Sequence, residues 1–118
     1  MQQYVEKLDL GLNALVSFKP DFVVLSLGFD TFHLDPLGSF KIETEDYASI
    51  AEHVGKRLKV LPMDVGGGGG GGGEGGEGGG GAGDSRVAIS CLILMEGGYV
   101  IEKLGPNLLS FLKAWEEV

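Results

Sequence analysis

A tract of glycine divides this chain and limits what it can fold into. Residues 66–84 contain 15 of the 22 glycines, and Glu74, Glu77 and Ala82 interrupt the tract. Glycine has no side chain to pack and loses more backbone freedom on folding than any other residue. We therefore expect this segment to be a disordered insertion. About a hundred of the 118 residues then remain to build a core, which is enough for one small domain.

Three segments outside the tract have the apolar spacing of helices. Residues 2–18 carry apolar side chains at intervals of three and four, and Pro20 should end that helix. Thr44 is placed to cap a second helix, whose apolar face extends to Leu58. Pro106 fits the first position of a third helix, where its missing N–H is not needed.

Two short apolar runs, Phe22–Leu27 and Val87–Met95, have the pattern of strands. Each run is continuous and rich in β-branched residues, which is typical of parallel strands buried on both faces. A helix between them implies a crossover connection, so we expect adjacent parallel strands in an α/β fold. Two strands cannot close such a domain, and their edges would need a cover. The chain is therefore expected to be part of a larger α/β domain.

Each strand-like run is followed by a loop with polar groups. The first run leads into Leu27-Gly28-Phe29-Asp30-Thr31, and Asp35-Pro36-Leu37-Gly38 follows in the same loop. The second leads through Met95-Glu96-Gly97-Gly98 to Tyr99. In open parallel sheets, ligands bind just beyond the carboxyl ends of the strands. We therefore expect Asp30 and Tyr99 at the same edge of the sheet.

The two motifs together resemble the C-terminal part of the zinc-dependent histone deacetylase family, and Leu27 and Thr31 favour its acetylpolyamine amidohydrolase branch. The resemblance implies a partial three-layer α/β/α parallel-sheet fold of the arginase/deacetylase type, truncated at its N-terminal side. Residues 1–65 and 85–118 would form one partial domain, with residues 66–84 as an insertion. The implied reaction is hydrolysis of acetyl amides of lysine or polyamines, so the substrate would be an acetylated amine or acetyl-lysine.

The resemblance also implies roles for single residues. Asp30 matches the aspartate ligand of the catalytic zinc ion, and a catalytic zinc site takes three protein ligands. Tyr99 matches the catalytic tyrosine, whose hydroxyl polarises the amide carbonyl and stabilises the oxyanion. Leu37 matches an apolar residue that lines the acyl-amine tunnel, and Gly97 and Gly98 let the backbone approach the substrate. These three are the expected substrate-binding residues.

Simpler interpretations of these residues stay open. Asp30 could cap backbone amides in its loop, Tyr99 could anchor the start of the next helix, and Leu37 could be a buried loop leucine. We expect Asp35 to order its loop rather than to perform chemistry. The remaining candidates have unremarkable expectations: His33 at the mouth of a pocket, His53 on a helix surface, and Cys91 as an inert core thiol.

The sequence lacks an adjacent His-His pair and an Asp-x-His pair, which in this family supply the base and further metal ligands. We therefore expect the isolated chain to be inactive. The alternative is a non-catalytic remnant that acts as an interaction module through its sheet edge and helix faces. The topology also allows a nucleotide-binding α/β module. The glycine tract does not support that function, because it lacks the following helix and the Lys-Ser/Thr of a phosphate loop.

Composition excludes several other classes. The net charge of −8 argues against binding nucleic acid. The longest apolar run is too short to span a bilayer, and the N-terminus lacks the layout of a secretory signal. A single cysteine fits a reducing compartment. We expect an intracellular protein, cytoplasmic or nuclear, and association of identical copies stays open.

Overall fold

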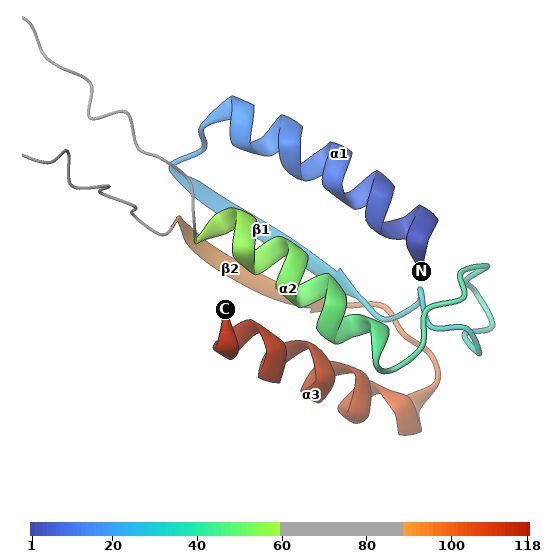
Figure 1. The fold of residues 1–118 in the computed structure, drawn as a ribbon. Helices are drawn as coiled ribbons and strands as arrows, with labels where there is room; N and C mark the ends of the chain where they lie inside the picture. Colours follow the sequence, from blue (N-terminus) through green and yellow to red (C-terminus); the bar gives the residue numbers. More distant parts are fainter. Residues whose placement is uncertain (60–88) are drawn as a thin grey trace, which may run out of the picture.

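The computed structural model describes residues 1–59 and 89–118. The elements in chain order are α1 (Gln2–Phe18), β1 (Phe22–Gly28), α2 (Asp46–Leu58), β2 (Ser90–Glu96) and α3 (Ile101–Glu117) (Figure 1). The α/β class is confirmed. The glycine tract, residues 66–84, lies outside the described residues, so its expected disorder and the proposed domain limits stay predictions. Within the described ranges, every helix is too short or too polar to cross a membrane.

The two strands form a parallel pair, as the sequence predicts. Phe22 stands opposite Ser90 and Gly28 stands opposite Glu96, so both strands end at the same edge of the sheet. The segment between the strands returns the chain through α2, which is the crossover helix expected between parallel neighbours. The loops after β1 and β2 therefore begin side by side (Figure 1).

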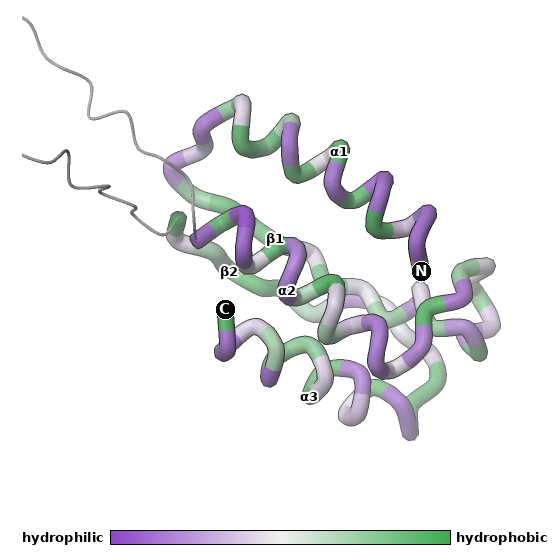
Figure 2. The backbone as a smooth tube through the Cα atoms, in the orientation of Figure 1, coloured by the Kyte–Doolittle hydropathy of each residue, from purple (hydrophilic) through white to green (hydrophobic). Residues whose placement is uncertain are grey.

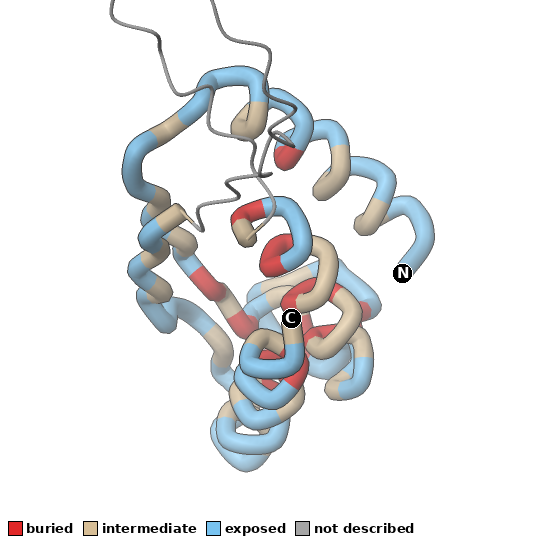
Figure 3. Tube along the Cα trace, turned by 60° about the vertical axis from the view of Figure 1, so that its left-hand side comes forward, coloured by how far each residue is buried: buried red, intermediate tan, exposed pale blue. Residues whose placement is uncertain are grey.

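The prediction that the strands are buried on both faces is wrong. Side chains at odd positions up to Ile93, such as Leu25 and Leu27, pack on the helical core, and those at positions 22, 24, 26, 90, 92 and 94 are exposed. The alternation ends at Met95, which is exposed. Figure 2 shows that both strands are largely hydrophobic, and Figure 3 shows the alternating burial. The reason is that the helices lie on one side of the sheet, so no described element covers its other face. Four apolar side chains on that face are 42–54% exposed: Phe22, Val24, Leu92 and Leu94.

Helix α2 forms the centre of the core, between α1 and α3 (Figure 1). Its predicted apolar face is buried, consisting of Tyr47, Ile50, Ala51, Val54 and Leu58. Phe111 of α3 is fully buried and stacks on Trp115 with ring centroids 5.8 Å apart. The helical spacing in the sequence thus identifies the side of α2 that faces the rest of the molecule.

Two predicted helix starts are wrong. Thr44 does not cap α2, because its hydroxyl donates to Oδ1 of Asn107 at 2.7 Å and so ties the approach to α2 onto α3. Asp46 instead accepts the N–H of Glu43 at 2.9 Å. Pro106 does not begin α3, which starts at Ile101 and contains Pro106 in its second turn. A proline there removes one backbone hydrogen bond but has a backbone angle compatible with a helix.

Candidate functional site

The loops after the two strands meet at the carboxyl edge of the sheet. The N–H of Phe29 donates to the carbonyl oxygen of Glu96 at 3.2 Å, which extends the pairing beyond the strands. A β-carbon on Gly97 would lie 3.0 Å from the carboxyl carbon of Asp30, so the backbone of the second loop lies against the Asp30 carboxylate. The structure thus brings Asp30 and the segment leading to Tyr99 together, as expected from the sequence.

Both glycines before Tyr99 have backbone angles that favour glycine, with φ of +54° at Gly97 and +93° at Gly98. A β-carbon on Gly98 would also lie 2.6 Å from Leu104 and 2.7 Å from Phe29, which is too close for any side chain. Backbone conformation and space therefore require glycine at this turn, whether or not a substrate approaches it.

Asp35 connects the two loops. Its carboxylate accepts the backbone N–H of Tyr99 at 2.7 Å through Oδ2 and the N–H of Leu37 at 2.9 Å through Oδ1. The residue is only 5% exposed. Its bond to Leu37 is the local turn that an aspartate two residues upstream commonly makes, and it bears out the loop-ordering expectation. The bond to Tyr99 was not predicted from the sequence, because nothing local connects residues 64 positions apart.

A buried tyrosine, Tyr47, forms a hydrogen bond to the loop that follows β1. The hydroxyl of Tyr47 lies 3.0 Å from Oγ1 of Thr31, and the Thr31 hydroxyl donates to the carbonyl oxygen of Gly28 at 3.4 Å. Either hydroxyl can act as the donor in the bond between Tyr47 and Thr31. Burial raises the pKa of Tyr47 to about 12, the hydrogen bond with Thr31 opposes this rise, and the negative charges of Asp30 and Asp35 add to it. Sequence periodicity identified Tyr47 only as a core residue.

A cavity of about 470 Å³ opens between these groups. Asp30, Thr31, Gly97 and Tyr99 line it together with apolar residues of the core. Asp30 is exposed and Tyr99 is 54% exposed, so both side chains are accessible. This size suits a small-molecule pocket. The candidate site is therefore accessible to ligands and contains the two residues that the motifs single out.

Leu37 and His33 lie outside this cavity. Leu37 is 73% exposed, so the alternative of a buried loop leucine is wrong. The Nδ1 atom of His33 lies 2.9 Å from Oε2 of Glu43. His53 contacts the carbonyl oxygen of Ser49 within α2. Cys91 is half-buried on the core side of β2, and burial raises the pKa of its thiol.

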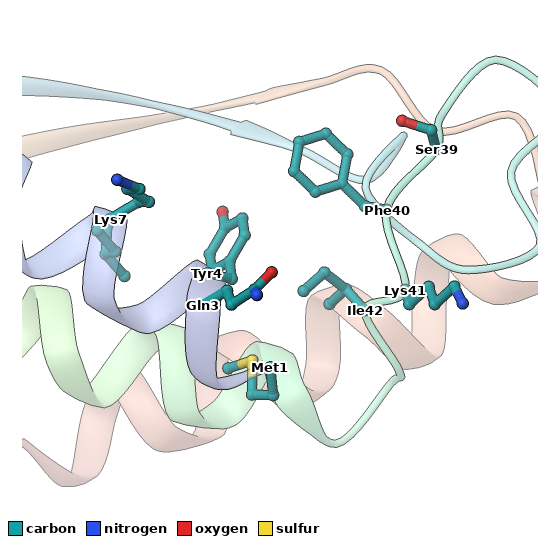
Figure 4. Close-up of a pocket in the computed structure, with 9 residues that line it drawn as sticks. Met1, Gln3, Tyr4, Lys7, Ser39, Phe40, Lys41 and Ile42 are labelled. Atoms are coloured by element: carbon teal, nitrogen blue, oxygen red, sulfur yellow. The ribbon is translucent and has the colours of Figure 1, made fainter.

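A larger hollow of about 760 Å³ lies between the start of α1 and residues 39–42 (Figure 4). The rings of Tyr4 and Phe40 meet there edge to face, with centroids 6.0 Å apart. Lys7 and Lys41 lie at its sides. Neither motif contributes a residue to this hollow. The smaller cavity is therefore the better candidate, because it holds the groups capable of chemistry.

The described residues do not fit a complete zinc site. Within residues 1–59 and 89–118, no three His, Cys, Asp or Glu side chains gather in a way that could hold a metal ion. Asp30 offers one carboxylate, whereas a catalytic zinc ion takes three protein ligands. Other ligands would have to come from outside the described residues.

The fold and site define an open parallel α/β edge with an accessible carboxylate and a tyrosine, and comparison with known proteins identifies the family. The family profile of the histone deacetylase domain matches residues 2–72. The chain belongs to this family, which is zinc-dependent. The matched range includes Asp30, Asp35 and Leu37, and ends before Tyr99.

Individual relatives extend the match over most of the chain. Acetylpolyamine amidohydrolase 2 of Pseudomonas aeruginosa is 25% identical over 113 residues, which are 96% of this chain and 24% of the relative. Histone deacetylase 14, chloroplastic, of Arabidopsis thaliana is 30% identical over 97 residues, covering 82% of this chain and 17% of the relative. The crystal structure of an acetylpolyamine aminohydrolase from Burkholderia pseudomallei matches with a TM-score of 0.65 and 26% identity, covering 95% of this chain and 24% of that chain. The chain thus spans 17–24% of the length of these relatives.

Proposed function

We propose that this chain supplies the C-terminal part of a zinc-dependent deacetylase domain that hydrolyses acetyl amides of polyamines or lysine. The observation that carries the proposal is the convergence of Asp30 and Tyr99 on one cavity at the carboxyl edge of the sheet. Membership of the histone deacetylase family and the match to acetylpolyamine amidohydrolases support the substrate class.

In this proposal Asp30 and Tyr99 have different roles. Asp30, an exposed carboxylate against the backbone of Gly97, would be one metal ligand. Tyr99 would donate its hydroxyl proton to the carbonyl oxygen of the acetyl group, where negative charge develops during hydrolysis. Leu37, Gly97 and Gly98 would form the rim that the acyl-amine chain passes. The base and the other ligands would come from outside the described residues.

A chimera tests these roles. The matched quarter of the Burkholderia pseudomallei enzyme is replaced by this chain, and zinc content and hydrolysis of an acetylated polyamine and an acetyl-lysine peptide are measured. Asp30→Ala should lose bound zinc and activity together. Tyr99→Phe should keep zinc while turnover falls about a hundred- to a thousandfold, the usual effect of losing one oxyanion donor. The isolated chain should show neither stoichiometric zinc nor turnover.

Matched variants outside the cavity lining serve as controls. Asp21→Ala removes an exposed carboxylate just before β1, at the opposite edge of the sheet. Ser17→Ala removes a hydroxyl that bonds within α1, to the carbonyl oxygen of Asn13. Both should leave zinc content and turnover close to those of the unmodified chimera. An active chimera in which Asp30→Ala retains its zinc, or in which Tyr99→Phe retains its turnover, contradicts the proposed roles.

The exposed apolar face of the sheet favours a second candidate, an interaction module without catalysis. Phe22, Val24, Leu92 and Leu94 present a continuous surface of the kind that marks contact sites. This candidate predicts that the chimera stays inactive with both acetylated substrates although it folds and binds zinc through its other ligands.

A further inference from the structure

The loop that presents Tyr99 is neither helix nor strand, and its backbone packs at Gly98 against Leu104 and Phe29. Gly97 and Gly98, both with positive φ, precede Tyr99, and α3 begins only at Ile101. The Tyr99 side chain is 54% exposed, so packing does not fix it. A catalytic hydroxyl misplaced by about 1 Å can lower a rate by roughly a hundredfold. The position of this loop therefore depends on contacts made by its backbone.

The strongest such contact comes from Asp35. Its Oδ2 atom lies 2.7 Å from the backbone nitrogen of Tyr99, at the short end of the range for a bond between an amide and a carboxylate. The second oxygen, Oδ1, accepts the N–H of Leu37 at 2.9 Å, so each oxygen of the carboxyl group has a backbone partner. Because Asp35 is 5% exposed, water competes little for either bond.

We propose that Asp35 is a positioning residue that sets where the Tyr99 hydroxyl stands over the cavity, by holding the Tyr99 backbone amide. The inference rests on the proposed role of Tyr99 in the reaction. It goes beyond that role because it assigns a function to a carboxylate that binds neither metal nor substrate. The buried carboxylate also joins the loop after β1, which carries the proposed metal ligand, to the loop after β2, which carries the tyrosine.

The first test needs no catalysis and uses the 118-residue chain. Hydrogen exchange of individual backbone amides is followed by NMR in the unmodified chain, in Asp35→Ala and in the isosteric Asp35→Asn. Loss of a bond to a charged acceptor should speed exchange of the Tyr99 amide about ten- to a hundredfold. Amides inside the core helix, such as that of Val54, should be unchanged in Asp35→Asn.

Asp46→Ala is the matched control, because Asp46 also accepts a loop amide, that of Glu43, but lies at the start of α2. It should leave the Tyr99 amide unaffected. Should Asp35→Ala unfold the chain, Asp35→Asn decides the question, since it preserves shape and one acceptor oxygen. Because asparagine has one acceptor oxygen and cannot hold both amides, equal exchange of the Tyr99 and Leu37 amides in the unmodified chain and in Asp35→Asn would overturn the proposal.

The second test asks whether Asp35 acts through Tyr99, and uses the chimera described above. Asp35→Asn should lower kcat by up to about a hundredfold while zinc content and KM stay near their starting values. In a Tyr99→Phe background the same change should lower kcat less than about threefold, because residues that act as a unit are not additive. Full additivity of the two changes, or an equal loss in Asp46→Ala, would show a merely structural role. If the chimera is inactive, the exchange experiment still tests the contact, so the two failures are distinguishable.

Discussion

Two polar side chains near the candidate site, Tyr47 and Asp35, are almost fully buried. Tyr47 bonds to the side chain of Thr31, and Asp35 bonds to the backbone of Leu37 and Tyr99. Tyr47 is 1% exposed and packs its ring edge to face on Phe29, with centroids 5.1 Å apart. Its hydroxyl supports Thr31, the residue directly after Asp30. A phenylalanine would fill the same space, so the hydroxyl is the part of Tyr47 that serves the Asp30 loop.

The raised pKa of Tyr47 predicts a loss of stability in alkali. Burial favours the neutral phenol in the folded state, with a pKa of about 12 against 10 in the unfolded chain. The resulting stabilisation is complete below pH 10 and is lost as the pH rises towards 12, by at most about 2–3 kcal/mol. Urea unfolding at pH 9, 10 and 11 measures this slope.

Tyr47→Phe provides the comparison for that measurement. At pH 8 it should be less stable by about 1 kcal/mol, because the bond to Thr31 is lost. Its stability should then fall less steeply than that of the unmodified chain between pH 10 and 12. Tyr4→Phe removes the other phenol whose pKa burial raises, and should have the smaller effect because Tyr4 is only half-buried. If the free energy of unfolding falls with pH equally steeply in Tyr47→Phe and in the unmodified chain, the alkaline loss of stability does not come from the raised pKa of Tyr47.

The sequence predicts the location of Asp30 and Tyr99 because it depends only on where two strands end. An apolar run that gives way to Gly28 or to Gly97 marks the end of a parallel strand, and parallel strands end at a common edge. The supporting bonds from Asp35 and Tyr47 were not predictable. Each depends on side-chain distances between segments far apart in the sequence, and local spacing carries no information on these distances.

At the scale of elements, hydrophobic periodicity correctly predicts which segments are helices and strands, and local signals are less reliable at their ends. Thr44 has the chemistry of an N-cap, but a bond to Asn107 takes its hydroxyl. Pro106 has the chemistry of a helix start, but the residues before it, Ile101 to Gly105, already continue the helix. For Thr44, a tertiary contact outweighs a local capping preference of about 1 kcal/mol. The prediction that both faces of the strands are buried was wrong, because a continuous apolar run does not show whether helices cover both faces of the sheet.

The surroundings of three glycines predict how substitution by alanine changes the stability of the chain. Gly11 in α1 has nothing within 4 Å of the place a β-carbon would take, so alanine there should stabilise by about 0.5–1 kcal/mol through helix propensity. Gly105 in α3 comes directly before Pro106, whose ring restricts a preceding β-carbon in a helix, so Gly105→Ala should bring no such gain. Gly98→Ala should destabilise by roughly 2–4 kcal/mol, because it combines a φ of +93° with overlap against Leu104 and Phe29. Urea unfolding measures all three, and a Gly98→Ala chain as stable as the original would refute the geometry of that turn.

At the scale of the whole molecule, the described part is a half-covered sheet. Its helices protect one face, and the opposite face exposes Phe22, Val24, Leu92 and Leu94 together with the polar Ser26 and Ser90. The strands also have unpaired outer edges within the described residues. A small α/β unit of this kind gains stability by covering such a surface. The match to about a quarter of a larger enzyme is consistent with a cover supplied by the remainder of a deacetylase domain.

This arrangement predicts that the isolated chain associates through the open face of the sheet. Val24 and Leu92 are direct cross-strand partners on that face, so Val24→Lys combined with Leu92→Glu places opposite charges side by side and keeps the strands paired. The double variant should sediment as a smaller species than the unmodified chain at the same concentration. Its free energy of unfolding should lie within about 1 kcal/mol of that of the unmodified chain as a monomer. Leu10→Lys, which removes an apolar side chain exposed on α1, should leave the association unchanged.

In the chimera the same double variant should prevent a folded, zinc-loaded enzyme from forming, because the charges would be buried beneath the second layer. A double variant that sediments like the unmodified chain and still yields an active chimera would mean that this face is not covered in either assembly.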